Sequence, residues 1–327
     1  MKKVIIGVHG LGNKPSKSLL QKWWSDAMLE GLNLININKD LPDFEMIYWA
    51  DILHEKPLNQ GISDKKDQAF LHEPYRKAPK KYVLDNHSIR KRVIDFVTVQ
   101  LNKIFLNEDY TLNYSFISKG IIKKYFKDLD AYYIKECKDH KNVSCMYRDL
   151  TRNRVVQVIK KYKNREIMII AHSMGSIITF DVLNFLIPKI KIHTLVTIGS
   201  PLGFPFVVGK IAAEQKITPN RKSIMSTPPG ITDKWYNFAD IMDYVALDYK
   251  LADNFTENDK GVLPKDCLVN NNYEINGIKN PHKSFGYLRT PEFSKILNDF
   301  IGEEKLNISQ KVLRRFKKLI QYFNINN

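Results

Sequence analysis

The sequence predicts an α/β protein in which a mostly parallel central sheet is covered by helices on both faces. Two observations predict this class. Short, almost wholly apolar runs alternate with longer helical patterns, and Gly-rich or polar turns separate them. The chain has 327 residues, of which 43% are hydrophobic, so it can bury a full core without the help of disulfides or metal ions.

The expected elements follow one another in a strand-helix alternation. A buried strand at 4–8 leads into a Gly-rich turn, and Pro15 and Ser16 begin a helix that carries Trp23 and Trp24 on its apolar face. Each later strand is a short apolar run, and the helix that Pro188 closes is almost wholly apolar. The further expected strands are 44–49, 167–170, 194–198 and 235–238, and the further helices are 147–162, 174–187 and 291–301.

Two segments interrupt this alternation and define the expected domains. The core with the strand-helix alternation comprises 1–53 and 147–302. Residues 54–146 separate strands that are normally one helix apart, and helical patterns at 88–106 and around 117–134 predict a helical cap or lid over the sheet edge. The tail, 303–327, has one apolar and one basic face and is expected to form a basic amphipathic helix, either docked on the body or lying on a membrane.

Charge and cysteine content bound the partners and the compartment. Lys and Arg number 51 against 35 Asp and Glu, a net charge of +16, which suits an anionic membrane surface or nucleic acid, although AT-rich coding accounts for it equally well. The 3 cysteines have no C-x-x-C spacing, so no disulfide framework is expected. The first apolar run is broken at His9, too early for a signal peptide. We expect a cytoplasmic protein, with peripheral membrane contact as the alternative.

One motif carries the predicted chemistry, Ala171-His172-Ser173-Met174-Gly175, which lies directly between a buried strand and a buried helix. A serine on so sharp a turn has a strained backbone, so the residues two before and two after it must be small, as Ala171 and Gly175 are. The turn raises the hydroxyl above the sheet and directs a helix N-terminus at it. Ser173 is therefore the candidate nucleophile, and an ordinary tight turn is the alternative.

A serine hydroxyl needs a base, and a strand-turn-helix architecture of this kind supplies it in the chain order Ser, acid, His. Only His193 and His282 follow Ser173, and His193 directly precedes a core strand, so His282 is the candidate base. Asp240 and Asp243 follow the last predicted strand. We expect Asp243 to meet the imidazole and Asp240 to hold the loop through backbone amides, with the reverse assignment as the alternative.

An oxyanion hole requires backbone donors beside the nucleophile. We expect one to be the N–H of Met174 and the other to be the N–H of Leu11, in the turn that begins at His9. Gly10 and Gly12 allow the backbone to approach closely. A dinucleotide-binding turn is the competing interpretation, but the spacing is not G-x-G-x-x-G, and that interpretation leaves the serine turn unexplained.

In these motifs the sequence resembles the α/β-hydrolase fold serine esterases and lipases, bacterial lipases among them. The resemblance implies that Ser173 is the nucleophile, His282 the base and Asp243 the acid, that no cofactor is needed, and that the substrates are acyl esters. Two positions depart from the common pattern: Ala171 replaces the first glycine, and Tyr244 stands where such acid loops often have proline. The matching segments are VHGLGN (8–13), AHSMGS (171–176), TIGSP (197–201), the D-x-x-D-x-V segment (240–245) and PHKSFGYL (281–288).

We therefore expect a carboxylic ester hydrolase that works through an acyl-enzyme on Ser173. A lipid ester is a further expectation, because the aromatic-rich insertion is suited to form an apolar lid. The alternatives are an acyltransferase or thioesterase with the same triad, and a non-catalytic, membrane-associated binding protein with this fold. No metal is expected, because His54-Glu55 and His72-Glu73 lack the second histidine of H-E-x-x-H. No nucleic-acid partner is expected, because no recognisable module is present.

Overall fold

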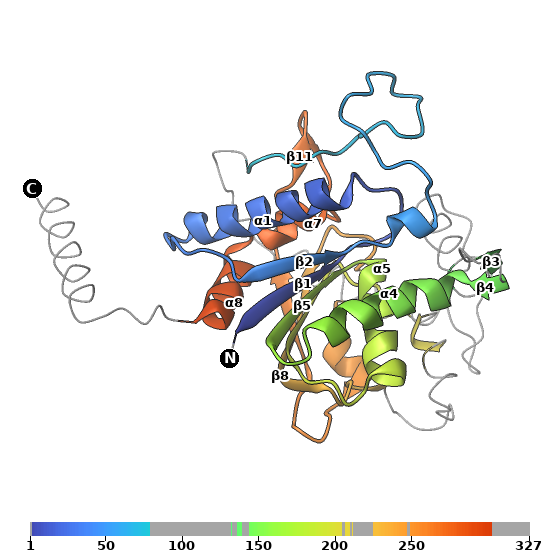
Figure 1. Ribbon diagram of the computed structural model, residues 1–327. Coiled ribbons are helices and arrows are strands. Elements are labelled where there is room, and N and C mark those ends of the chain that lie inside the picture. The colour runs from blue at the N-terminus through green and yellow to red at the C-terminus, as the bar shows by residue number, and fades with distance from the viewer. Residues whose placement is uncertain are drawn as a thin grey trace, which may run out of the picture.

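The computed structural model describes residues 2–78, 132, 136–138, 144–204, 207–209, 211, 225–246 and 249–302, and its centre is a six-stranded sheet (Figure 1). The strands are β1 Lys3–Val8, β2 Asp43–Ile47, β5 Glu166–His172, β6 Ile192–Ile198, β8 Ile231–Asp240 and β10 Pro264–Val269. Their order in space is β10-β8-β6-β5-β1-β2, and each neighbouring pair is parallel. The predicted α/β class is confirmed.

Helices cover this sheet, and short ribbons extend from it. The helices are α1 Lys17–Leu34, α4 Tyr147–Lys161, α5 Met174–Asp181, α7 Ser284–Leu288 and α8 Pro291–Ile301. The shorter helical turns are η1 Ala50–Ile52, η3 Val182–Leu186 and η4 Leu251–Asn254. The two-stranded ribbons in the described part of the chain pair β3 Glu136–Lys138 with β4 Ser144–Met146, β7 Met225–Ser226 with β9 Phe255–Thr256, and β11 Glu274–Ile275 with β12 Ile278–Lys279.

The structure contains each predicted strand, mostly with bounds extended by a few residues, but two features differ from the prediction. β10 was not predicted, because this edge strand is only partly buried between its two ends and therefore has no continuous apolar run. The helix expected at 174–187 is not uniform: α5 passes into the π-helical turn η3, where the N–H of Ile187 bonds the carbonyl of Val182 at 3.0 Å.

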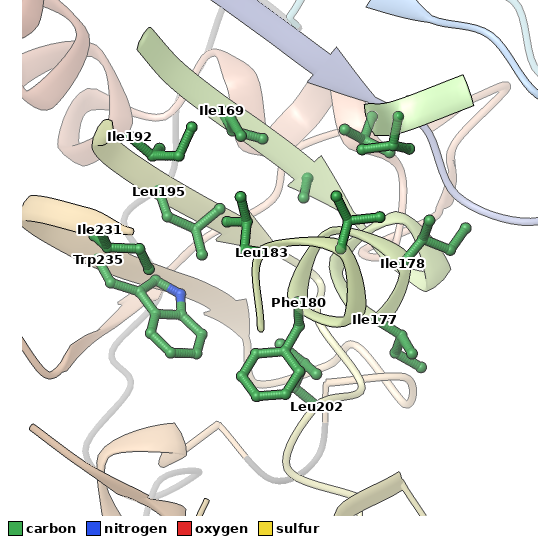
Figure 2. Packing of buried hydrophobic residues seen from close by; sticks show 14 of the residues in the cluster. Ile169, Ile177, Ile178, Phe180, Leu183, Ile192, Leu195, Leu202, Ile231 and Trp235 are labelled. Carbon is green, nitrogen blue, oxygen red and sulfur yellow. The ribbon is translucent and has the colours of Figure 1, made fainter. Parts of the chain in front are cut away.

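The two faces of the sheet build two separate hydrophobic cores. Because successive strand residues point to opposite faces, Val4 and Ile6 pack toward α4 and α5, whereas Ile5 packs toward α1, α7 and α8. Figure 2 shows the first core, in which the side chains of α5 and η3 lie against those of β5, β6 and β8. A strand buried on both faces is apolar along most of its length. This is why continuous apolar runs, without an alternation of polar and apolar residues, predicted the strands.

The topology of the sheet determines where a ligand site can form. β1 pairs with β2 on one side and with β5 on the other. The connection after β1 therefore leads to one edge of the sheet, and the strands from β5 onward extend toward the other edge. At such a switch point the connections diverge and leave a crevice at the carboxyl ends of the two strands. The turn after β1, at 9–13, and the turn after β5, at Ser173, both lie at this edge.

The start of the predicted cap, residues 54–78, is described. It contains no helix and is an irregular loop tied by isolated bridges between Pro15 and Leu58 and between Asn59 and Phe70. The helical patterns at 88–106 and most of 117–134 lie outside the described residues, as does the basic tail 303–327, and they stay predictions. No helix among the described residues is long and apolar enough to cross a membrane.

Helix α1 packs unusually closely against the junction of α7 and α8. The contact is made at Gly31, where a Cβ would lie 2.4 Å from Ser294 Oγ and 2.7 Å from Arg289 Cα. Backbone cannot rotate away from such a contact as a side chain can. The glycine is therefore required by packing, although it is the least favourable residue in a helix interior after proline.

We predict that Gly31→Ala destabilises the protein despite its better helix propensity. Alanine gains about 1 kcal/mol in the helix, whereas overpacking against fixed backbone costs about 1–3 kcal/mol, so a net loss of about 1 kcal/mol is expected. Urea titration measures the free energy of unfolding. Asn33→Ala, an exposed substitution on the same helix, is the control and should be neutral or stabilising. An equal gain for both variants would contradict the packing argument.

Candidate active site

Ser173 occupies the strained turn between β5 and α5. Its backbone has φ 54° and ψ −128°, a region that residues other than glycine rarely adopt, and it is 2% exposed. The turn can be this tight because Gly175 and Gly10, which pack against it, have no side chains. A Cβ on Gly175 would lie 2.5 Å from the carbonyl oxygen of Val8, and one on Gly10 would lie 2.7 Å from the Cβ of Ser173. The structure thus places the serine directly against the turn after β1.

Ser173, His282 and Asp243 form one continuous chain of hydrogen bonds. The Oγ of Ser173 lies 3.0 Å from the Nε2 of His282. The Nδ1 of His282 lies 2.9 Å from each carboxylate oxygen of Asp243. The carboxylate side chain is 0% exposed, while the imidazole is 29% exposed and accessible from the crevice. The three side chains predicted from the sequence are therefore brought together.

The hydrogen-bond partners determine the tautomer of His282. A carboxylate only accepts, so Nδ1 carries the proton, and Nε2 is left to accept from the Ser173 hydroxyl. Two further donors hold Asp243: the hydroxyl of Tyr287 at 2.7 Å and the N–H of Val245 at 2.9 Å. Burial, followed by the charges of Asp243 and Asp240, raises the pKa of Tyr287 well above its ordinary value, which keeps that hydroxyl protonated as a donor.

Asp240 has the loop-holding position expected of it. Its carboxylate accepts from the N–H of Met242 at 2.7 Å and from the N–H of Asn271 at 2.6 Å. Its own N–H donates to the hydroxyl of Tyr287 at 2.9 Å. Tyr287 therefore joins the two aspartates, and the geometry places Asp243, not Asp240, against the imidazole.

The loop that carries His282 is held by residues that the sequence analysis did not single out. The side-chain amide of Asn271 donates to the carbonyls of Pro281 at 2.7 Å and Lys283 at 2.8 Å. The ring of His172 contacts the carbonyl between them, that of His282, with its Nε2 at 2.7 Å. Because a carbonyl only accepts, that Nε2 carries the proton. Three consecutive carbonyls are thus fixed by side chains from other elements.

Gly199 is a third residue that the sequence analysis did not single out. It follows β6 with φ 53°, and a Cβ there would lie 2.8 Å from Asp243 Oδ2 and 3.2 Å from His282 Nδ1. Any other residue would occupy the space in which acid and base meet. A glycine directly after a predicted strand, in the TIGSP segment, was the available signal.

The turn after β1 is oriented by His9. Its Nδ1 lies 2.7 Å from the carbonyl of Gly10, and its Nε2 accepts from the N–H of Trp49 at 3.0 Å. Burial, followed by the charge of Lys14, lowers the pKa of His9 well below its ordinary value, so the ring is neutral and can serve as donor and acceptor. Because the peptide is planar and trans, holding the Gly10 carbonyl also fixes the direction of the Leu11 N–H.

The two expected oxyanion donors are available. Within the described part of the chain, neither the N–H of Leu11 nor that of Met174 donates to another group. Met174 is the first residue of α5, so its amide is one of the unsatisfied donors that every helix N-terminus leaves. Both amides flank Ser173: one follows it in the chain, and the other belongs to the turn that packs on it.

A cavity of about 500 Å³ lies over this constellation. Ser173, His282 and Leu11 line its floor, and most of the remaining wall is apolar. The apolar lining residues are Leu20, Trp23, Trp24, Leu58, Phe70, Leu71, Val245 and Phe285. Most of them come from α1, α7 and the loop at 54–78, so this loop contributes to the wall although it is not helical. Such a volume suits a small molecule with an apolar part.

Within the described residues, no three His, Cys, Asp or Glu side chains gather as ligands of one metal ion. The glycines after β1 have other contacts than those of a dinucleotide site. Gly10 lies against Ser173, and the Nζ of Lys14 donates to the carbonyl oxygen of Gly12 at 3.0 Å. Among the described residues, the groups that meet at the crevice are the hydroxyl of Ser173, the imidazole of His282 and the carboxylate of Asp243, with the amides of Leu11 and Met174 beside them.

The strain at Ser173 is expected to be measurable as stability. Backbone strain of this kind costs about 1–3 kcal/mol, and glycine relieves it at an unfolded-state cost of about 0.5–1 kcal/mol. We predict that Ser173→Gly is more stable than Ser173→Ala by about 1 kcal/mol, because both lose the hydroxyl but only alanine keeps the strain. Thermal and urea unfolding measure the difference in the free energy of unfolding between the two variants. If the turn were not strained, Ser173→Gly would be less stable than Ser173→Ala by about 0.5–1 kcal/mol, the unfolded-state cost of glycine alone.

Comparison of the sequence with profiles of known protein families and with curated proteins gave no match in either case. Support for a function comes instead from the geometry of the site and from the order of its residues along the chain.

Proposed function

We propose that the protein is a serine hydrolase of the α/β-hydrolase fold that cleaves carboxylic esters through an acyl-enzyme. One observation supports this above all others: Ser173, on a strained turn at a switch point of the sheet, is joined through His282 to the buried Asp243. An ordinary tight turn needs neither the base nor the buried acid. The arrangement meets the geometric requirements of an activated nucleophile.

The first half of the reaction acylates the enzyme. His282 takes the proton of Ser173 as the Oγ attacks the ester carbonyl, and Asp243 stabilises the imidazolium that forms. The oxyanion of the tetrahedral intermediate accepts hydrogen bonds from the amides of Leu11 and Met174. The imidazolium then gives its proton to the alkoxide oxygen of the leaving alcohol, the C–O bond breaks, and the acyl group stays on Ser173.

The second half of the reaction repeats these steps with water. His282 takes a proton from a water molecule, which attacks the acyl carbonyl, and the same two amides hold the second oxyanion. Collapse returns the proton to Ser173 and releases the carboxylic acid. The partly exposed imidazole suits this step, because water must reach it, while the fully buried carboxylate stays shielded from solvent.

The order of elements also supports the α/β-hydrolase fold. The nucleophile follows β5 and begins α5, the acid follows β8, and the base lies in the loop after β10 that leads to α7 and α8. Each catalytic group thus lies at a carboxyl end of the sheet, and the chain order is Ser, Asp, His, as in that fold. The loop at 54–78 contributes Leu58, Phe70 and Leu71 to the wall of the cavity over these groups.

We predict that the protein hydrolyses p-nitrophenyl hexanoate and that Ser173→Ala or His282→Ala lowers kcat by about 10⁴-fold or more. Asp243→Asn should cost a similar factor, because the imidazole loses its correct tautomer. Absorbance of released p-nitrophenol measures the rate. His193→Ala is the matched control, a histidine that also follows Ser173 but lies outside the site, and its rate should equal that of the parent protein. Undiminished hydrolysis by Ser173→Ala would overturn the proposal.

A further inference from the structure

The cavity over Ser173 contains a cation that the proposed mechanism does not use. Lys14 follows the turn after β1, lines the cavity and is partly buried. Its Nζ folds back onto the turn and donates to the carbonyls of Leu11 and Gly12. The backbone at Lys14 is itself anchored, because its carbonyl accepts from the N–H of Leu58 at 2.9 Å. The ammonium is thereby held on the turn that supplies an oxyanion donor.

The charge on Lys14 is not balanced within the described part of the chain. No carboxylate there lies within ion-pair distance of its Nζ. The second lysine of the cavity, Lys283, is by contrast paired with Glu73 at 2.9 Å. Protein carbonyls supply dipoles but no counter-charge. Among the described lining residues, Lys283 is therefore compensated and Lys14 is not. A partly buried cation without a counter-ion is costly unless a ligand provides one.

The protonation of Lys14 reflects the same imbalance. Desolvation, followed by repulsion from Lys283, lowers its pKa to about 7, and the opposing attraction of Glu73 does not restore it. Lys14 also interacts with His9 and His172, whose pKa values burial lowers and which are therefore neutral. The other described histidines that line the cavity are His72 and His282. An anion bound at this position would favour the ammonium and raise its pKa again.

We propose that the substrate is an ester bearing an anionic group, a carboxylate or a phosphate, that pairs with the Lys14 ammonium while the scissile carbonyl lies at Ser173. This inference rests on the proposed ester hydrolysis and specifies its substrate class. The rest of the cavity is suited to an apolar segment of the same molecule, since Trp23, Trp24 and Phe285 line it. The expected substrate is thus an amphiphilic acid, not a neutral ester.

The test compares a charged and a neutral ester of equal length. The pair is mono-p-nitrophenyl adipate and p-nitrophenyl hexanoate, and the quantity is the ratio of their kcat/KM values. We expect a preference of about tenfold for the adipate ester, lost in Lys14→Met and kept in Lys14→Arg. A ratio is measured because Lys14→Met also removes hydrogen bonds to the turn, which lowers both rates together. Lys17→Met, an exposed lysine on α1, is the control and should keep the ratio.

A second pair locates the anion and covers phosphate. Hexanoyl glycerol phosphate and hexanoyl glycerol differ by an anionic group on the alcohol side of the ester. The adipate pair differs by an anionic group on the acyl side. Loss of preference in either pair on Lys14→Met supports the proposal and identifies the side. The preference should also fall in the parent protein as the pH rises through the pKa of Lys14, about 7, but not in Lys14→Arg. No preference in either pair, or a ratio that Lys14→Met leaves unchanged, would overturn it.

A binding measurement separates this inference from the proposed function. Calorimetry of monomethyl adipate and methyl hexanoate with the Ser173→Ala protein, with and without Lys14→Met, requires no turnover. Tighter binding of the adipate that disappears with Lys14→Met supports the anion site even if no ester is hydrolysed. Equal binding of both esters would overturn the anion site even if hydrolysis depends on Ser173.

Discussion

The proposed chemistry requires Ser173 to stay in a strained backbone conformation, with φ at 54°. A positive φ at a serine persists only where its surroundings leave no alternative. Here β5 before it and α5 after it are both buried, and the Ser173 N–H is fixed to the carbonyl of Ile198 at 3.1 Å. The two hydrophobic cores thus hold the turn in a conformation that it would not adopt alone. The free energy gained by packing the two cores offsets the strain of the turn and thereby fixes the position of the Ser173 hydroxyl.

The site depends on three glycines as much as on its polar side chains. Gly175 lets α5 start against the end of β1, Gly10 lets the next turn touch Ser173, and Gly199 leaves the space in which acid and base meet. Around these spaces, the buried polar groups are paired: Tyr287 joins the two aspartates, and Asn271 links the acid loop to the histidine loop. This network fixes the positions of the acid and the base relative to each other.

The sequence predicted what depends on local pattern or chain order. Uniform apolar runs predicted the inner strands, and the order of Ser173, Asp243 and His282 along the chain led to three side chains that the structure places in contact. It did not predict β10, whose half-buried pattern has no clear period. Nor did it single out His172 or Asn271. Each of these side chains bonds backbone carbonyls of the loop at 281–283, which lies 10 or more residues away in the chain. Long-range pairing of that kind leaves no local signal.

Covalent labelling measures whether the hydroxyl of Ser173 is an activated nucleophile. The intact protein is treated with a fluorophosphonate and digested, and the modified residue is located by mass spectrometry. We expect a single adduct on the peptide containing Ser173, formed much more slowly in His282→Ala. A folded protein that gains no adduct, or gains one at another residue while Ser173 stays unmodified, would contradict it.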